Sequence, residues 1–162
     1  MTIAPDSTPL YNSALETGVR TVLLLSAAQP KSFDLMHLTW LDHLVVHTAD
    51  IDGPTSLHPD IPQRDGELIV RRRNVEEGLR LMRRLHLVST DYTTDGIMFH
   101  ITEEGAQFAQ LVRSKYGRLL KARAAWLMDY VGRVDTSEFV RLISEKIGRW
   151  SIEFQTEGAA NG

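Results

Sequence analysis

The sequence predicts a mainly α-helical protein with one small β-hairpin, and three observations support this fold class. Apolar residues recur at helical spacing in several long segments, and two short β-rich runs flank an Asp95-Gly96 turn signal. Of the 162 residues, 43% are hydrophobic, which is enough to form one core. Because Gly and Pro occur at ordinary levels, we expect a single folded domain.

Two helices are expected near the N-terminus, after a flexible leader at residues 1–10. The first covers residues 13–29, with Asn12 or Ser13 as its N-cap. The second follows Ser32, a natural N-cap, and continues to residue 47. Apolar residues one helical turn apart place both helices in the core. They are Leu15, Val19, Val22 and Leu23 in the first helix, and Leu35, Leu38, Leu41 and Val45 with neighbouring Trp40 in the second.

The segment at residues 48–66 is predicted to be a long loop without regular secondary structure. It contains three prolines, two glycines and four aspartates. Loops longer than about 12–15 residues are uncommon in compact domains and are usually functional or disordered. Because Leu57 and Ile61 could hold it against the body, we expect an ordered loop that faces a partner, with a disordered loop as the alternative.

The second half of the chain predicts a helix, a hairpin and further helices. A third helix is expected from Glu67, because apolar residues again lie about one turn apart. The runs LVST and IMFHIT predict the hairpin, with DYTTDG as its turn. Thr102 caps the next helix, which we expect to break or bend near Gly117 before continuing. Asp135 or Thr136 caps a last helix.

This order of elements is typical of a winged helix-turn-helix domain, here with extra C-terminal helices. We therefore predict a winged-helix domain at residues 11–131, with the hairpin as its wing. A C-terminal helical extension at 132–154 and a disordered tail at 155–162 are expected to follow.

Composition excludes several classes of protein. The chain has no cysteine, which excludes disulfides and thiolate metal sites and suits a reducing compartment. It has neither a run of about 18 apolar residues nor a signal-peptide pattern, so we expect a cytoplasmic protein that does not cross a membrane. A Gly-rich phosphate loop, a nucleophile elbow and a paired-carboxylate motif are missing too. We expect no catalytic residue, no cofactor and no enzymatic activity.

Basic side chains concentrate in the middle of the chain. Residues 67–123 carry 11 basic and 7 acidic side chains, whereas residues 1–66 carry 3 basic and 8 acidic ones. Six arginines lie on the third helix, where winged-helix proteins place their DNA-recognition helix. They are Arg71, Arg72, Arg73, Arg80, Arg83 and Arg84. Since Glu76 and Glu77 stand one turn from Arg80 and Arg73, we favour a salt-bridged solvated face or a protein interface over direct DNA contact.

A second basic run, from Arg113 to Arg123, contains no acidic residue. Lys115, Arg118 and Lys121 follow an i, i+3 stripe on the expected helix. This stripe could bind a nucleic-acid backbone through electrostatics that do not depend on base sequence. An exposed, solubilising helix face is the favoured alternative.

Two histidines, His43 and His47, have the spacing of metal ligands on one helical face. Asp42, Asp50 and His58 lie nearby in sequence. Because no glutamate of the metalloprotease motif stands between the histidines, we favour structural roles over a metal site. His47 and His58 are expected to donate hydrogen bonds that hold the loop, and His43 to be partly exposed.

The last helix carries an apolar stripe that includes Leu142 and must be buried somewhere. It follows an already complete winged-helix unit, so it packs either on the protein's own second helix or on a partner subunit. For the second alternative, the candidate docking residues are Phe139, Ile143, Ile147 and Trp150, together with Leu57 and His58 of the loop.

Several of these segments resemble the middle components of bacterial ABC-three-component systems, small proteins encoded beside an SMC-like ATPase and an effector. The likeness covers about residues 11–131, and its most distinctive part is DGPTSLHP at residues 52–59. Where the family has Tyr after the aspartate of the second helix, this chain has His43. The other resembling stretches are YNSALETGVR at 11–20, FDLMHLTWLDHLVVH at 33–47, RRRNVEEGLRLM at 71–82 and GIMFHITEEG at 96–105, with Trp126 beyond them.

This resemblance implies a non-catalytic adaptor that bridges the SMC-like ATPase and an effector, such as a nuclease, in a DNA-sensing complex. Lamassu-type antiphage defence is the nearest setting. The loop at 52–59 and the C-terminal apolar stripe would dock the partners, and the two basic segments could touch DNA. The alternative is a MarR-like dimeric transcriptional regulator that reads DNA with the same hairpin and arginine helix. The acidic N-terminal third and the embedded glutamates favour the adaptor.

Overall fold

The computed structural model describes residues 13–59 and 67–147, and it is mainly helical with one antiparallel hairpin. That part of the prediction is confirmed. The leader predicted at 1–10 and the tail predicted at 155–162 lie outside the described residues. The elements are α1 (Ala14–Ala28), α2 (Leu35–Val46), the 3-10 helix η2 (Thr48–Ile51), α3 (Glu67–Arg84), β1 (Val88–Thr93), β2 (Gly96–Ile101), α4 (Glu103–Leu111), α5 (Lys115–Arg133) and α6 (Thr136–Ile147).

Side-chain caps define where the first two helices begin. Ser13 caps α1, as predicted. Helix α2 begins later than predicted, because Asp34 rather than Ser32 caps it and accepts a 2.8 Å hydrogen bond from an amide of the first turn. The chain before α2 stays extended, since the backbone of Phe33 pairs in both directions with that of Phe99 in β2. A contact distant in sequence thus overrides a local helix signal.

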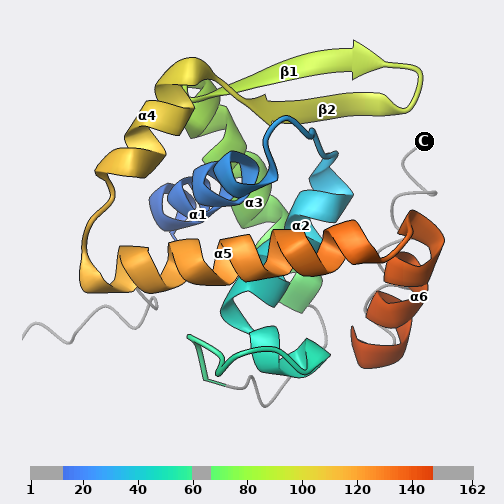
Figure 1. The fold of residues 1–162 in the computed structure, drawn as a ribbon. Coiled ribbons are helices and arrows are strands. Elements are labelled where there is room, and N and C mark those ends of the chain that lie inside the picture. The colour runs from blue at the N-terminus through green and yellow to red at the C-terminus, as the bar shows by residue number, and fades with distance from the viewer. Residues whose placement is uncertain (1–12, 60–66, 148–162) are drawn as a thin grey trace, which may run out of the picture.

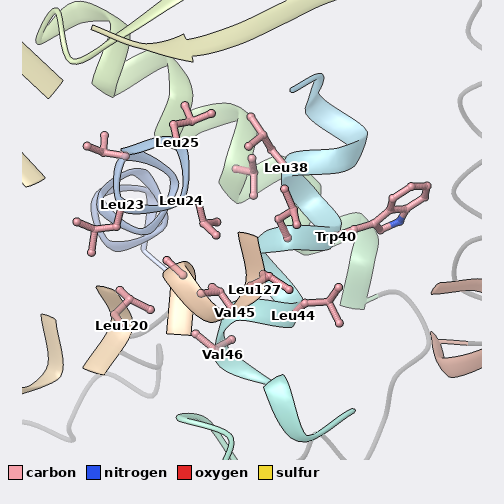
Figure 2. Close-up of a cluster of buried hydrophobic side chains, with 14 of the residues drawn as sticks. Leu23, Leu24, Leu25, Leu38, Trp40, Leu44, Val45, Val46, Leu120 and Leu127 are labelled. Atoms are coloured by element: carbon pink, nitrogen blue, oxygen red, sulfur yellow. The ribbon is translucent and has the colours of Figure 1, made fainter. Parts of the chain in front are cut away.

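The core lies between α1, α2, α3 and α5, with α5 running across α1 and α2 (Figure 1). Every residue of α2 from Leu38 to Val46 is buried, so this helix is covered on all sides and not only along the predicted stripe. Such burial is expected of a helix that is apolar around most of its circumference. Figure 2 labels the side chains that meet here: Leu23, Leu24, Leu25, Leu38, Trp40, Leu44, Val45, Val46, Leu120 and Leu127.

The hairpin projects from the helical body at the top of Figure 1. Val88 pairs with Ile101 at its buried root, and Thr93 pairs with Gly96 at its tip. The turn therefore consists of residues 94–95 only, and Gly96 supplies a positive φ of 111°. Residues 91–93, predicted in the turn, continue β1 instead, because cross-strand pairing extends to the tip.

Caps also mark the later helices. Thr102 caps α4, as predicted, and Asp135 caps α6, one of the two residues proposed for that role. The break predicted near Gly117 lies slightly earlier, at residues 112–114, because Ser114 caps α5. Among the described helices, none combines the length and the apolar character needed to cross a bilayer.

The connection after α2 contradicts the prediction of a wholly irregular loop, because η2 forms at its start. The Thr48 hydroxyl donates a 2.7 Å hydrogen bond to the carbonyl of Pro54, and the Gly53 amide donates a 2.9 Å bond to the carbonyl of Thr48. These local bonds make residues 48–54 compact despite their proline and glycine content. Ile61 lies outside the described residues.

Candidate interaction surfaces

Helix α3 exposes three of the arginines that the sequence offers as candidate DNA contacts: Arg73, Arg80 and Arg84. The predicted pair between Arg80 and Glu76 is present, with a nitrogen-to-oxygen distance of 3.3 Å between two well-exposed side chains. Arg72 is half-buried. The helix therefore presents a basic surface that one glutamate partly neutralises.

Arg71 was a candidate for contact with DNA, which requires an exposed side chain, but it is only 6% exposed. Its Nη1 atom lies 2.6 Å from Asp42 Oδ2, and its Nη2 atom lies 2.6 Å from Glu67 Oε1. A buried guanidinium that is paired with two carboxylates is not accessible to DNA phosphates. Arg71 is therefore a structural residue and leaves the set of candidate DNA contacts.

Asp42 is the centre of a buried ionic network that links α1, α2 and α3. Arg20 of α1 donates from Nε to Asp42 Oδ1 at 2.9 Å, opposite the contact from Arg71. Burial alone would raise the pKa of the Asp42 carboxyl, but the charges and hydrogen bonds of the two guanidiniums outweigh burial and lower it. Burial also opposes ionisation of Glu67, yet contacts with His43 and Arg71 lower its pKa to about 2.

Sequence reasoning missed this network, although a signal for it was present. Arg20 and Asp42 are isolated charges within apolar helical segments, and an isolated charge in a core helix requires a buried partner. Which charges would meet could not be read from spacing along one helix, because each of the three helices contributes to the network.

The two histidines of α2 that have the spacing of metal ligands, His43 and His47, are buried in the structure. His43 is only 2% exposed rather than partly exposed, and its Nε2 lies 3.1 Å from Asp50 Oδ2. Its ring stacks on that of His47 with centroids 4.5 Å apart. Burial, together with the charges of His43 and Arg71, lowers the pKa of His47 to about 4. Within the described ranges, no three His, Asp or Glu side chains are grouped so that they could hold a metal ion.

The distinctive loop at residues 52–59 lies against the protein's own α5. Arg123 donates from Nε and Nη2 to the carbonyl of Thr55, at 3.1 and 3.0 Å. Gly53 faces the ring of Trp126 so closely that a Cβ atom there would lie 2.4 Å from it. Residues 52–59 therefore pack closely against α5 and are held there by hydrogen bonds.

Leu57 and His58, predicted to dock a partner, are half-buried in the same loop. Their amides both donate 3.1 Å hydrogen bonds to the carbonyl of Val46, and Leu57 packs against the core. His58 forms a 2.7 Å hydrogen bond with the Tyr116 hydroxyl, as its predicted loop-holding role requires. Burial is the main cause that lowers the pKa of His58 to about 4, and nearby arginine charges add to it. His47 differs, because its Nε2 has no hydrogen-bond partner among the described residues.

The apolar stripe of α6 packs on the protein itself. Phe139 and Ile143 are 3% and 0% exposed, and the Phe139 ring lies 6.3 Å from that of Trp40 and 6.4 Å from that of His37. The sequence left open whether this stripe packs on the protein's own second helix or on a partner. Phe139 and Ile143 are buried within the protein, with Phe139 against α2, so they do not form an exposed docking surface. The side chain of Ile147 and the whole of Trp150 lie outside the described residues.

The second basic run remains at the surface. Lys115 and Arg118 are exposed at the start of α5, whereas Lys121 is half-buried. Arg123, by contrast, is used to hold the loop. Arg113 just before α5 is exposed as well, so three cations of this run, with half-buried Lys121 beside them, are positioned where an anion could reach them.

A further basic surface lies where the end of α3 meets β1. It is an open hollow of about 950 Å³, and we call it the arginine hollow. Three arginines and one glutamate supply its charges, so its balance is positive. Its lining residues are Arg80, Arg83, Arg84, His86, Val88, Ser89, Thr90, Thr102 and Glu104.

Comparison with known proteins identifies the family. Residues 10–153 match the family model described as ABC-three component (ABC-3C) system Middle Component 2. The chain belongs to this family. The match extends past residue 131, where the resemblance seen in the sequence ends, and includes α6. No curated protein and no solved structure matches the chain.

As a middle component, the protein works in a system that has other subunits. Its hairpin and α4 are acidic, because residues 85–112 contain no Lys or Arg and four acidic side chains. Near the hairpin tip, Tyr92 and Ile97 are cross-strand partners and are 78% and 48% exposed. The hairpin and α4 of this Middle Component 2 protein thus combine negative charge with exposed apolar side chains. The acidic residues are Asp91, Asp95, Glu103 and Glu104.

Proposed function

We propose that this Middle Component 2 protein is a non-catalytic adaptor that bridges an SMC-like ATPase and an effector such as a nuclease. Its setting would be a cytoplasmic, DNA-sensing antiphage complex of the Lamassu type. Protein docking is the main activity in this proposal, and contact with DNA is secondary. Family membership, which implies partner subunits, is the principal support.

We also propose that α1 to α4 and the hairpin form a winged helix, with α5 and α6 as additions. The pairing of Phe33 with Phe99 supports this assignment, since it places a single-residue β-bridge between α1 and α2, beside β2. The connection from α2 to α3 is much longer than the turn of about 3–4 residues in a helix-turn-helix motif. Because of this long connection, α2 and α3 do not form a standard helix-turn-helix motif, and we do not expect them to read DNA in the standard way.

Charge is the single observation that favours docking over DNA reading. A wing that approaches DNA enters a strongly negative potential, and basic side chains are the usual means of binding there. Here the expected wing contains Asp91 and Asp95 and no Lys or Arg. An acidic wing with exposed Tyr92 and Ile97 fits a protein partner better than a phosphate backbone.

Secondary DNA contact would use the exposed cations and would not depend on base sequence. The candidates are Arg73, Arg80 and Arg84 on α3, half-buried Arg72 beside them, and Lys115, Arg118 and Lys121 on α5. A non-catalytic role agrees with the use of buried Asp42 and half-buried Glu67 in pairs with arginines.

The adaptor role is tested by purifying the tagged chain from its native host and identifying the stoichiometric partners by mass spectrometry. We expect an SMC-like ATPase. Thr55→Arg places a charge on the exposed side of the loop, and we expect it to reduce recovery by about tenfold if this loop docks the partner. Ala125→Arg adds the same charge at an exposed site on α5 and serves as the matched control. Isolation of a homodimer that binds one promoter sequence would instead identify a MarR-like regulator.

A further inference from the structure

One edge of the hairpin is open, and its orientation follows from the hydrogen bonds of β2. Phe99 exchanges both backbone hydrogen bonds with Phe33, at 3.0 and 2.8 Å, so its N–H and C=O point away from β1. Its partner in β1 is Thr90. In an antiparallel ladder, a residue opposite such a position also points its backbone groups outward. The N–H and C=O of Thr90 therefore face outward from the free edge of β1, and alternation predicts the same for Val88 and Tyr92.

The arginine hollow lies along this edge. Val88, Ser89 and Thr90 are consecutive, and their side chains alternate between the two faces of the hairpin. Because all three line the hollow and no residue of β2 does, the hollow borders the strand edge rather than either face. In the described residues, no backbone group bonds to the outward N–H or C=O of Thr90. An edge of this kind can accept an additional strand.

The opposite wall of the hollow is basic. Arg80, Arg83 and Arg84 line it from α3, and all three are exposed. Just after the end of α3, His86 has a left-handed φ of 61°, a conformation that is usually adopted by glycine. A non-glycine residue in such a conformation is a reason to look for a function at that place.

We propose that the arginine hollow binds an extended acidic segment of a partner subunit, which adds as a strand to the free edge of β1. Main-chain hydrogen bonds to Thr90 would align the segment, and its carboxylates would pair with Arg83 and Arg84. This proposal rests on the proposed adaptor role, because it requires a partner subunit. It assigns the docking surface to the hairpin edge rather than to the loop at 52–59 or to α6.

The surroundings of the hollow favour a peptide over a DNA duplex. Asp91, Asp95 and Glu103 stand on the hairpin and at the start of α4, and Glu104 lines the hollow itself. A duplex presents a dense row of phosphates over a long surface and would meet these carboxylates. A single extended strand is narrower, carries fewer charges and also uses the open backbone groups, which a duplex does not need.

Two pairs of variants separate the two parts of the site. Thr90→Pro removes the outward N–H while leaving the pairing with β2 intact, and Thr90→Ala keeps that N–H as its control. Arg83→Gln with Arg84→Gln removes two charges from the hollow. Its matched control is Arg133→Gln with Arg141→Gln, two exposed arginines that do not line it. Thermal unfolding establishes that each variant is folded, and the arginine pair keeps the test decisive if Thr90→Pro unfolds.

The binding probe is a set of random linear peptides, displayed and selected on the full-length chain. The enriched peptides are synthesised, and their affinity is measured by fluorescence anisotropy. We expect acidic, β-prone sequences whose affinity falls about tenfold with Thr90→Pro and tenfold or more with the hollow arginine variant. Both control variants should bind like the wild type. Enrichment of neutral or basic sequences, or affinity insensitive to both test variants, would overturn the proposal.

A labelled DNA duplex tests the competing ligand on the same proteins. If the duplex displaces the peptides and depends on Arg83 and Arg84 but not on the amide of Thr90, the hollow is a nucleic-acid site and the proposal is wrong. Partner recovery from the native host separates this proposal from the adaptor role. If the hollow arginine variant recovers every partner in wild-type amounts, the adaptor role stands and the hollow proposal fails. If the wild type recovers none, the adaptor role fails by itself.

Discussion

At the scale of single residues, Asp42 has the largest structural consequence. Its side chain is 0% exposed and is shared by Arg20 of α1 and Arg71 of α3. Removal of a buried carboxylate that two buried guanidiniums share leaves the charges of both guanidiniums less well compensated. The network therefore specifies how α1, α2 and α3 are placed against one another.

We predict that Asp42→Asn lowers the free energy of unfolding by about 3–5 kcal/mol, because two buried arginines lose the carboxylate that they share. Denaturant unfolding monitored by circular dichroism measures this change. Glu76→Gln removes a carboxylate from an exposed pair and should change the free energy by less than about 1 kcal/mol. Equal effects of the two substitutions would show that the buried network is not a source of stability.

The residue-level interpretation of the arginine helix was only partly predictable. Helical spacing identifies Arg73, Arg80 and Arg84 as neighbours on α3, and these three are exposed. Spacing along α3 could not identify Arg71 as buried, because its burial depends on Asp42 in another helix. Likewise, the burial of Phe139 depends on Trp40, a residue distant in sequence.

At the scale of elements, the junction between the hairpin and α4 is the tightest packing among the described glycines. A Cβ atom on Gly105 would lie 2.1 Å from the carbonyl oxygen of Leu87 and 2.7 Å from a side-chain carbon of Ile101. The same carbonyl accepts a 3.1 Å hydrogen bond from the Thr102 amide. The first turn of α4 can therefore lie this close to the root of the hairpin only with glycine at this position.

We predict that Gly105→Ala destabilises the protein by about 2–3 kcal/mol, because either α4 or the root of the hairpin must move. Thermal unfolding of the variant measures the loss. Gly132→Ala, in α5, adds a methyl group to open space and should be neutral or stabilising by up to about 1 kcal/mol. A stable Gly105→Ala protein with unchanged hairpin amide exchange would contradict the packing that we describe.

Element boundaries could be predicted where a local cap decides them. Ser13, Thr102 and Asp135 begin helices at or next to the predicted positions, because a side-chain oxygen bonding to a nearby amide is a local interaction. The prediction of Ser32 as an N-cap was wrong because Phe33 pairs with β2, and no local signal reveals that pairing. The 3-10 helix after α2 was missed for a related reason, since proline and glycine content indicates turns but not their geometry.

At the scale of the whole molecule, stability should depend on pH through buried histidine. The unfolded chain binds a proton at His47 near pH 6.5, whereas the folded protein does so only near its pKa of about 4. As pH falls through this window, the unfolded state gains a proton that the folded state does not, so stability decreases. His58 lowers the stability of the folded protein in the same pH range, because its pKa in the folded protein is also about 4.

We predict a loss of about 1–2 kcal/mol from His47 between pH 7 and pH 4, after allowance for solvent screening. Urea unfolding across this range tests it, and His47→Gln should flatten the slope. Glu76→Gln is the control, because Glu76 belongs to an exposed pair with Arg80 and its removal should leave the slope unchanged. A wild-type slope that persists unchanged in His47→Gln would contradict the assignment.

The division of charge along the chain has a spatial counterpart. The exposed arginines of α3 and the cations at the start of α5 form basic surfaces, whereas the hairpin and α4 are acidic. Several surfaces of different chemistry on one small protein suit a subunit that contacts more than one partner. A dimeric regulator would instead require one continuous basic surface that spans the wing and the recognition helix.

The native mass of the chain isolated from its host tests the adaptor role most directly. Native mass spectrometry of the tagged protein, purified at moderate salt, gives the composition of every stable particle. The account predicts particles that contain this chain together with an SMC-like ATPase, with an effector subunit in some or all of them. A sole species consisting of two copies of this chain would contradict the adaptor role and favour a stand-alone DNA-binding dimer.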